Sequence, residues 1–148
     1  MLLPIVLGAV LGGLFIVVAR GRKPRGEIQL LAVGLAVAAL IYIVFALVGG
    51  ADPRWLTLEV AGLGVFGVFA WLGLRGSLWW LAAGWGAHVG WDLGLHLDRA
   101  QAFVPAWYPL LCAGFDLVVA GFLLGEASAG RPSRTEAAEQ GSREAASE

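Results

Sequence analysis

Residues 28–48 read IQLLAVGLAVAALIYIVFALV, a run of 21 residues without a charged side chain. An α-helix of this length rises about 30 Å at about 1.5 Å per residue, which matches the hydrocarbon thickness of a bilayer. The stretch therefore predicts a transmembrane helix, and the rest of the chain can be interpreted outward from it.

Four further apolar stretches of similar length lie on either side of this one, at 2–19, 55–74, 77–97 and 106–125. Short connections that contain glycine and proline separate the stretches, and connections this short place consecutive helices antiparallel. We therefore predict an all-α polytopic membrane protein. Its residues 1–125 are expected to form one up-down bundle of five transmembrane helices.

The overall composition agrees with a membrane location. Hydrophobic residues make up 59% of the 148 residues and charged residues 14%, whereas soluble domains contain roughly 25% charged residues. The lipid bilayer is thus the expected partner. A formal net charge of -1 argues against a nucleic-acid partner, which would require a clustered basic surface. The frequent Arg, Ala, Gly and Leu residues are typical of a GC-rich bacterial gene.

Residues 126–148 differ from the rest of the chain because they consist mainly of Ala, Ser, Glu and Arg. Such a segment has too little apolar surface to offset its ordering entropy, so we expect a polar, disordered tail. Four bases follow the first apolar stretch, and Arg75 lies in the next loop on the same side. The positive-inside rule then predicts a multi-pass protein of the cell (cytoplasmic) membrane, with the N-terminus outside and the tail in the cytoplasm.

Five ionisable residues fall well inside the predicted helices. Each costs on the order of 2.5–3.5 kcal/mol to insert into a bilayer, so each calls for a partner, a cavity or an ion. Three of them are spaced four apart on the fourth helix and therefore share one face of it. Counting about 1.5 Å per residue from the outer helix ends places them all in the outer half of the membrane, where we expect one connected cluster. These residues are Glu59, His88, Asp92, His96 and Asp116.

Carboxylate and imidazole groups are ligands of Zn²⁺ and similar divalent ions. The candidate metal ligands are His88, Asp92, His96 and Asp116, with the metal held by Asp92, one histidine and a further carboxylate. Glu59 is a candidate ligand or general base of a hydrolytic reaction. Two other readings stay open. The same groups could relay protons or ions, as in a small transporter, or form a structural polar network in a non-catalytic module that recruits a partner.

Small residues at four-residue spacing favour close contacts between membrane helices. The pairs Gly8/Gly12 and Gly121/Gly125 and the ladder Gly86, Gly90 and Gly94 have this spacing. The ladder lies opposite the polar face of the fourth helix, so that helix is expected to pack tightly through it. The same glycine faces offer surfaces for a homo-oligomer, while no feature identifies a protein partner of the tail. The single cysteine, Cys112, cannot form an internal disulfide and is interpreted as a packing residue.

The polar positions form a recognisable pattern along the middle of the chain: Glu59, Arg75-Gly76, His88-Val-Gly-Trp91-Asp92 with His96, Pro105, and Cys112-Ala-Gly-Phe-Asp116. This pattern resembles a family of small, mostly bacterial integral membrane proteins known as domain of unknown function 6010. Two positions depart from the family pattern, because Leu95 replaces the first histidine of a pair and Phe115 replaces a second cysteine. The resemblance implies no activity, but it implies that these polar residues are characteristic of the family.

Overall fold

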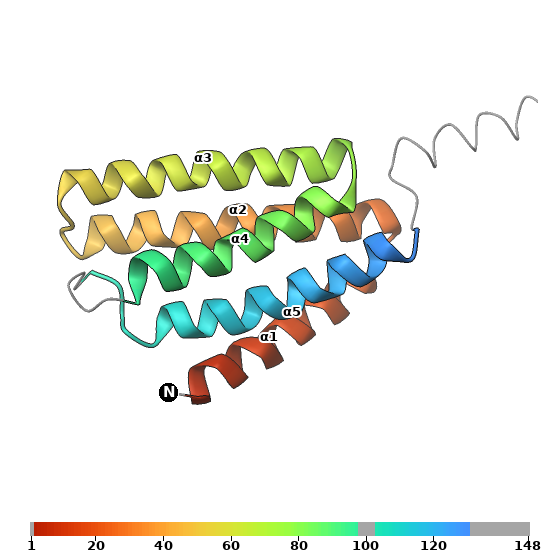
Figure 1. The fold of residues 1–148 in the computed structure, drawn as a ribbon, viewed down its shortest axis with the longest axis horizontal. Helices are drawn as coiled ribbons and strands as arrows, with labels where there is room; N and C mark the ends of the chain where they lie inside the picture. Colours follow the sequence, from red (N-terminus) through yellow and green to blue (C-terminus); the bar gives the residue numbers. More distant parts are fainter. Residues whose placement is uncertain (1, 98–102, 131–148) are drawn as a thin grey trace, which may run out of the picture.

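The computed structural model describes residues 2–97 and 103–130, which form a bundle of five helices (Figure 1). Helices consecutive in the chain run antiparallel, whereas the first helix packs beside the fifth and runs parallel to it. The helices are α1 (Leu2–Arg20), α2 (Pro24–Val48), α3 (Pro53–Arg75), α4 (Leu78–His96) and α5 (Tyr108–Ser128). The prediction of an all-α bundle is confirmed. The α5 helix runs to Ser128, so it includes the first residues of the predicted tail. The remainder of that tail, from residue 131 onward, lies outside the described residues.

Four of the helices, α1, α2, α3 and α5, are long and apolar enough to cross a membrane. The α4 helix does not meet this criterion, because its histidines, aspartate, glycines and tryptophans lower its hydropathy. Large apolar side chains cover the outside of the bundle, with Leu2 exposed by 78% and Val48 by 83%. An outer surface of this kind is a feature of an integral membrane protein.

The helix ends follow the local sequence. Pro24 and Pro53 occupy the first turns of α2 and α3, where the missing N–H is not needed. Asp52 caps α3 by accepting a hydrogen bond of 2.8 Å from the backbone N–H of Arg54. Gly50 turns the chain between α2 and α3 with a φ of +64°, a conformation that suits glycine. The prolines suit the early start of both helices, and α3 has the Asp52 cap in addition, whereas Lys23 at the start of α2 makes no side-chain cap.

The α1 helix packs against α5 through glycines, as the spacing of Gly8 and Gly12 predicts. A Cβ atom at Gly8 would overlap the carbonyl group of Leu111, and one at Gly12 would lie 2.8 Å from the carbonyl oxygen of Phe115. Gly114 of α5 approaches the carbonyl group of Ile5 in the same way. The two backbones are therefore in direct contact, which only glycine permits.

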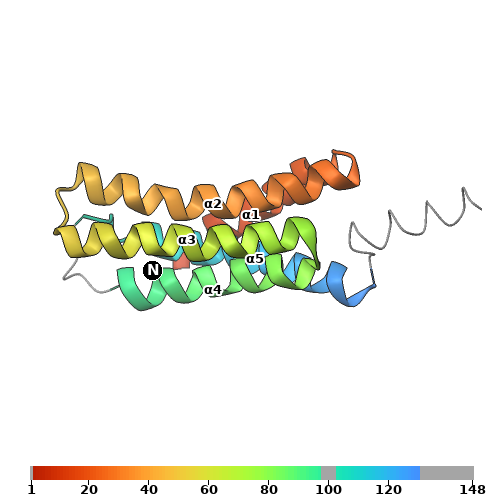
Figure 2. The same ribbon diagram turned by 90° about the horizontal axis from the view of Figure 1, so that it is seen from above.

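The glycine ladder of α4 does not pack as predicted. A Cβ atom added at any of its three glycines would meet no described atom within 4 Å, and the same is true at Gly121 and Gly125. The expectation of a tight contact through this ladder inside the bundle is wrong. The physical reason is that α4 lies at an edge of the bundle in Figure 2, with its polar face buried against α3 and α5 and the three glycines on the opposite face exposed.

Candidate functional site

The five ionisable residues singled out in the sequence are all buried. His88 and Asp92 are fully covered, Glu59 and Asp116 are 1% exposed, and His96 is 4% exposed. They lie in the half of the bundle that includes the α2–α3 turn, the end of α4 and the start of α5 (Figure 1). The predicted polar face of α4 therefore points into the bundle, where α3 and α5 supply the other two carboxylates.

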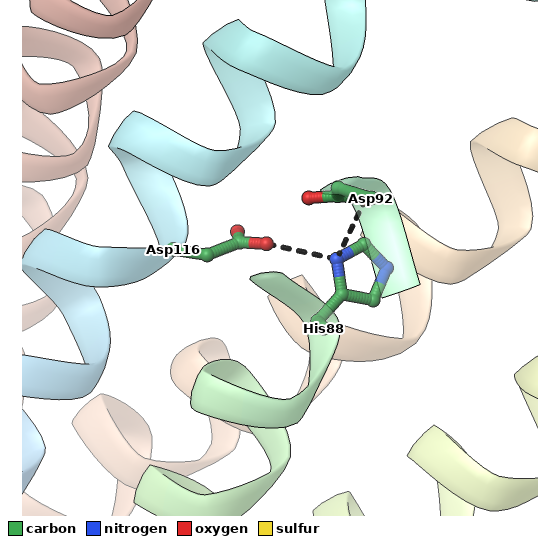
Figure 3. Close-up of side chains that lie close together, drawn as sticks. All are labelled: His88, Asp92 and Asp116. Atoms are coloured by element: carbon green, nitrogen blue, oxygen red, sulfur yellow. Dashed lines mark hydrogen bonds and ion pairs between the residues drawn. The ribbon is translucent and has the colours of Figure 1, made fainter. Parts of the chain in front are cut away.

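His88 is held between two aspartates from different turns and helices (Figure 3). Its Nδ1 atom lies 2.8 Å from Oδ2 of Asp116 on α5 and 3.4 Å from Oδ1 of Asp92, one turn along α4. One ligand atom from each of the three residues lies within 4.8 Å of the other two. We call these residues the histidine–aspartate group.

Glu59 and His96 form a second contact, nearer the end of the bundle. Oε1 of Glu59 lies 3.1 Å from Nε2 of His96, and Oε2 accepts a hydrogen bond of 3.2 Å from the indole N–H of Trp91. We call Glu59, Trp91 and His96 the glutamate–histidine group. The structure thus divides the predicted cluster in two, because eight residues, about 12 Å of helix rise, separate the two histidines along α4.

Tyr42 of α2 connects the two groups. Its ring stacks on His96, with 4.2 Å between ring centroids and an interplanar angle of 17°, and its centroid lies 6.0 Å from that of His88. The Tyr42 hydroxyl is buried beside Asp92 without meeting the geometry of a hydrogen bond. The sequence interpretation missed this residue. The available signal was a lone phenol inside the uncharged run 28–48.

Buried polar atoms without a hydrogen-bond partner gather in this region. Among the described side chains, atoms that meet no hydrogen-bond geometry occur on five residues, all of them in the two groups or in the tyrosine between them: Tyr42 Oη, Glu59 Oε1, His88 Nε2, both carboxylate oxygens of Asp92, and both ring nitrogens of His96. Of these, Glu59 Oε1 and His96 Nε2 still face each other as an ion-pair contact, as does Asp92 Oδ1 with His88 Nδ1. An unsatisfied buried polar group costs about 1–3 kcal/mol. Their concentration in one place is typical of a binding site rather than of a dry helix contact.

The donor set of the histidine–aspartate group fits a divalent metal ion. Tetrahedral bonds of about 2.0–2.2 Å separate neighbouring ligand atoms by about 3.3–3.6 Å. The 3.4 Å between His88 Nδ1 and Asp92 Oδ1 matches this separation, whereas the 2.8 Å to Asp116 Oδ2 is a hydrogen-bond distance that would lengthen on metal binding. Two buried carboxylates beside one imidazole also carry negative charge that requires protons or a cation. Three protein ligands leave positions open for water or substrate, as catalytic metal sites do.

Comparisons with known proteins identify a family and nothing closer. No curated protein and no solved structure matches the chain. The profile of a family of unknown function, DUF6010, matches residues 3–129, which include all five helices apart from the first residue of α1. The chain therefore belongs to the DUF6010 family of unknown function, in agreement with the resemblance seen in its polar residues.

Proposed function

We propose that this protein is a membrane-embedded metalloprotein that binds one divalent ion through His88, Asp92 and Asp116. The observation that carries the proposal is the convergence of one ligand atom from each residue within 4.8 Å, in a region with unpartnered buried carboxylate oxygens. An ion such as Zn²⁺ would compensate the two carboxylates at a depth where water cannot. His96, a predicted ligand, pairs with Glu59 instead and is not part of this proposed set.

A hydrolytic reaction is the chemistry that this arrangement supports best. A bound divalent ion supplies Lewis-acid chemistry and activates water at neutral pH. The chain supplies the other parts: His88, Asp92 and Asp116 would hold the ion, and the glutamate–histidine group, one turn along α4 from Asp92, can hold a proton. In this scheme Glu59 acts as a proton acceptor rather than as a metal ligand.

The proposal places all five helices across the membrane, with the site in the outer half. Support comes from α4, which contacts both α3 and α5 and whose polar side chains are buried. The bases Arg20, Lys23, Arg25 and Arg75 all lie at the bundle end away from the site. The positive-inside rule then favours an outer location for the site and a cytoplasmic location for the C-terminus.

Elemental analysis of detergent-purified protein tests the metal site directly. We expect about one Zn²⁺ or Mn²⁺ per chain after loading and dialysis, and strongly reduced retention in Asp92→Asn. The matched control is Asp52→Asn, which removes an exposed carboxylate that caps α3 at the same end of the bundle. The metal proposal fails when wild-type protein retains no stoichiometric metal, or when Asp92→Asn retains as much as the control.

A proton relay is the second candidate, because a specific observation favours it. Two histidine–carboxylate contacts follow each other along α4, with the Tyr42 hydroxyl between them. Such a series of titrating groups is typical of proton pathways in membranes. The test is proton flux in liposomes between about pH 5 and 8. Flux no greater than that of empty vesicles rejects this candidate, and flux abolished by Glu59→Gln supports it.

A further inference from the structure

A cavity of about 300 Å³ lies between α1, α2 and α5, with Trp85 of α4 contributing to its wall. Its lining is apolar over most of its length, with Leu11 and Phe15 from α1, Val37 and Ala38 from α2, and Leu111 and Phe115 from α5. Among the residues that the structure describes, Asp116 is the only carboxylate in its wall. We call this cavity the α1–α2–α5 groove.

The groove opens on the surface that faces lipid. Leu11 and Val37 line it from opposite sides, and they are 46% and 47% exposed. The reason for the opening is the packing pattern, because α1 packs mainly against α5 while α2 packs mainly against α3. The space between these two helix pairs is therefore accessible from within the bilayer.

Asp116 links the groove to the histidine–aspartate group. Its side chain lines the groove, while its Oδ2 atom lies 2.8 Å from His88 Nδ1 (Figure 3). A molecule that fills the groove would thus end against the proposed metal centre. The helices α1 and α2, which supply none of the metal ligands, would determine which molecule can reach it.

We propose that the α1–α2–α5 groove binds the hydrocarbon chain of a single-chain lipid and directs its head group to the histidine–aspartate group. At about 30 Å³ for a group the size of water or a methylene, the groove has room for about ten such groups, which is part of one alkyl chain. Water is disfavoured there because the walls offer it few polar partners. The role of the lipid head group rests on the metal site proposed above, whereas binding of the hydrocarbon chain in the groove does not.

Photolabelling tests where the chain binds. The probe is a palmitate analogue with a diazirine in the middle of its chain, added to the purified full-length protein in phosphatidylcholine vesicles. Mass spectrometry of peptides should then find labels concentrated on groove residues of α1, α2 and α5. Ala38→Phe, which fills the groove, should lower this labelling at least several-fold.

The matched control is Leu40→Phe, which adds a phenyl ring to α2 at a lipid-exposed position outside the groove. Its labelling should equal that of the wild type. Leu11→Trp blocks the groove from α1 and provides a second variant should Ala38→Phe not fold. The proposal is overturned when the labels are spread evenly over the lipid-exposed helices, or when a folded blocked variant is labelled as strongly as Leu40→Phe.

Metal content measured on the same samples separates this inference from the proposed function. Groove labelling without stoichiometric metal supports binding of the hydrocarbon chain in the groove and rejects the metal site. The proposed role of the lipid head group is then rejected as well. Stoichiometric metal without groove labelling rejects the lipid inference and leaves the metal site standing. Competition by unlabelled palmitate but not by acetate supports recognition of the chain, and equal competition by both contradicts it.

Discussion

Replacing Asp116 by asparagine changes one charge in the histidine–aspartate group while keeping the shape of the side chain. Oδ2 of Asp116 lies 2.8 Å from His88 Nδ1, both side chains are buried, and the carboxylate is one of three proposed ligands. As a ligand of the ion, this carboxylate should contribute at least as much as a hydrogen bond to a charged group, which is about 1.5–3 kcal/mol. At about 1.4 kcal/mol per factor of ten, metal binding should weaken by about 10- to 150-fold.

This loss can be measured as stability. At a free metal concentration of about 100 Kd, binding stabilises the folded wild type by about 2.7 kcal/mol. At the same metal concentration, the weakened Asp116→Asn should gain only about 0.3–1.3 kcal/mol. The assay is unfolding in detergent with and without Zn²⁺, with Asp52→Asn as a control that keeps the full wild-type gain. Equal metal-dependent gains in Asp116→Asn and the wild type would refute the assignment of Asp116 as a ligand.

Three further predictions concern packing and the glutamate–histidine group. Gly8→Val should lower the free energy of unfolding by about 1–3 kcal/mol or more, because its Cβ would overlap the α5 backbone. Gly13→Val has open space around it and should unfold like the wild type in the same assay. Tyr42→Phe should lose no more than about 1 kcal/mol of stability, because the hydroxyl that it removes lies beside Asp92 outside hydrogen-bond geometry and the ring is kept. A loss above 1 kcal/mol would show that this hydroxyl is bonded. Trp91→Phe should lower the free energy of unfolding by about 0.5–1.5 kcal/mol, because it removes the indole N–H that donates to Glu59. A double-mutant cycle should show a smaller loss when Trp91→Phe is made in the Glu59→Gln variant. A Trp91 cost that is independent of Glu59 would contradict the contact.

Much of the fold could be predicted from hydropathy, because the surface that a helix presents to lipid must be apolar. Gly49-Gly50 and Pro53 interrupt the apolar run, and they locate the turn because the chain can leave a helix only where it leaves the hydrocarbon. The glycine spacing had less predictive value. Gly8 does contact α5, whereas the ladder around Gly90 contacts nothing within the described bundle. Spacing shows which residues share a face, but it does not show which face meets a neighbour.

For the site, the four-residue spacing on α4 correctly placed His88, Asp92 and His96 on one face, and all three are buried. The distribution of partners could not be read from spacing. Asp116 reaches His88, while Glu59 reaches His96 and Trp91, because each pairing depends on the relative height and rotation of α3 and α5 against α4.

The sequence by itself determined that the chain forms apolar helices and that its few titratable groups must turn away from lipid, since an unpaired charge in hydrocarbon is too costly. Only the tertiary structure decided that these groups divide into two sets, that Tyr42 stands between them, and that Asp116 lines a groove open to the outside of the bundle. The physical reason is that periodicity constrains one helix at a time. Distances between side chains on different helices depend on how closely the helix backbones approach each other. The backbone of α1 directly contacts that of α5, for example, while α1 and α2 make few contacts and leave the groove between them.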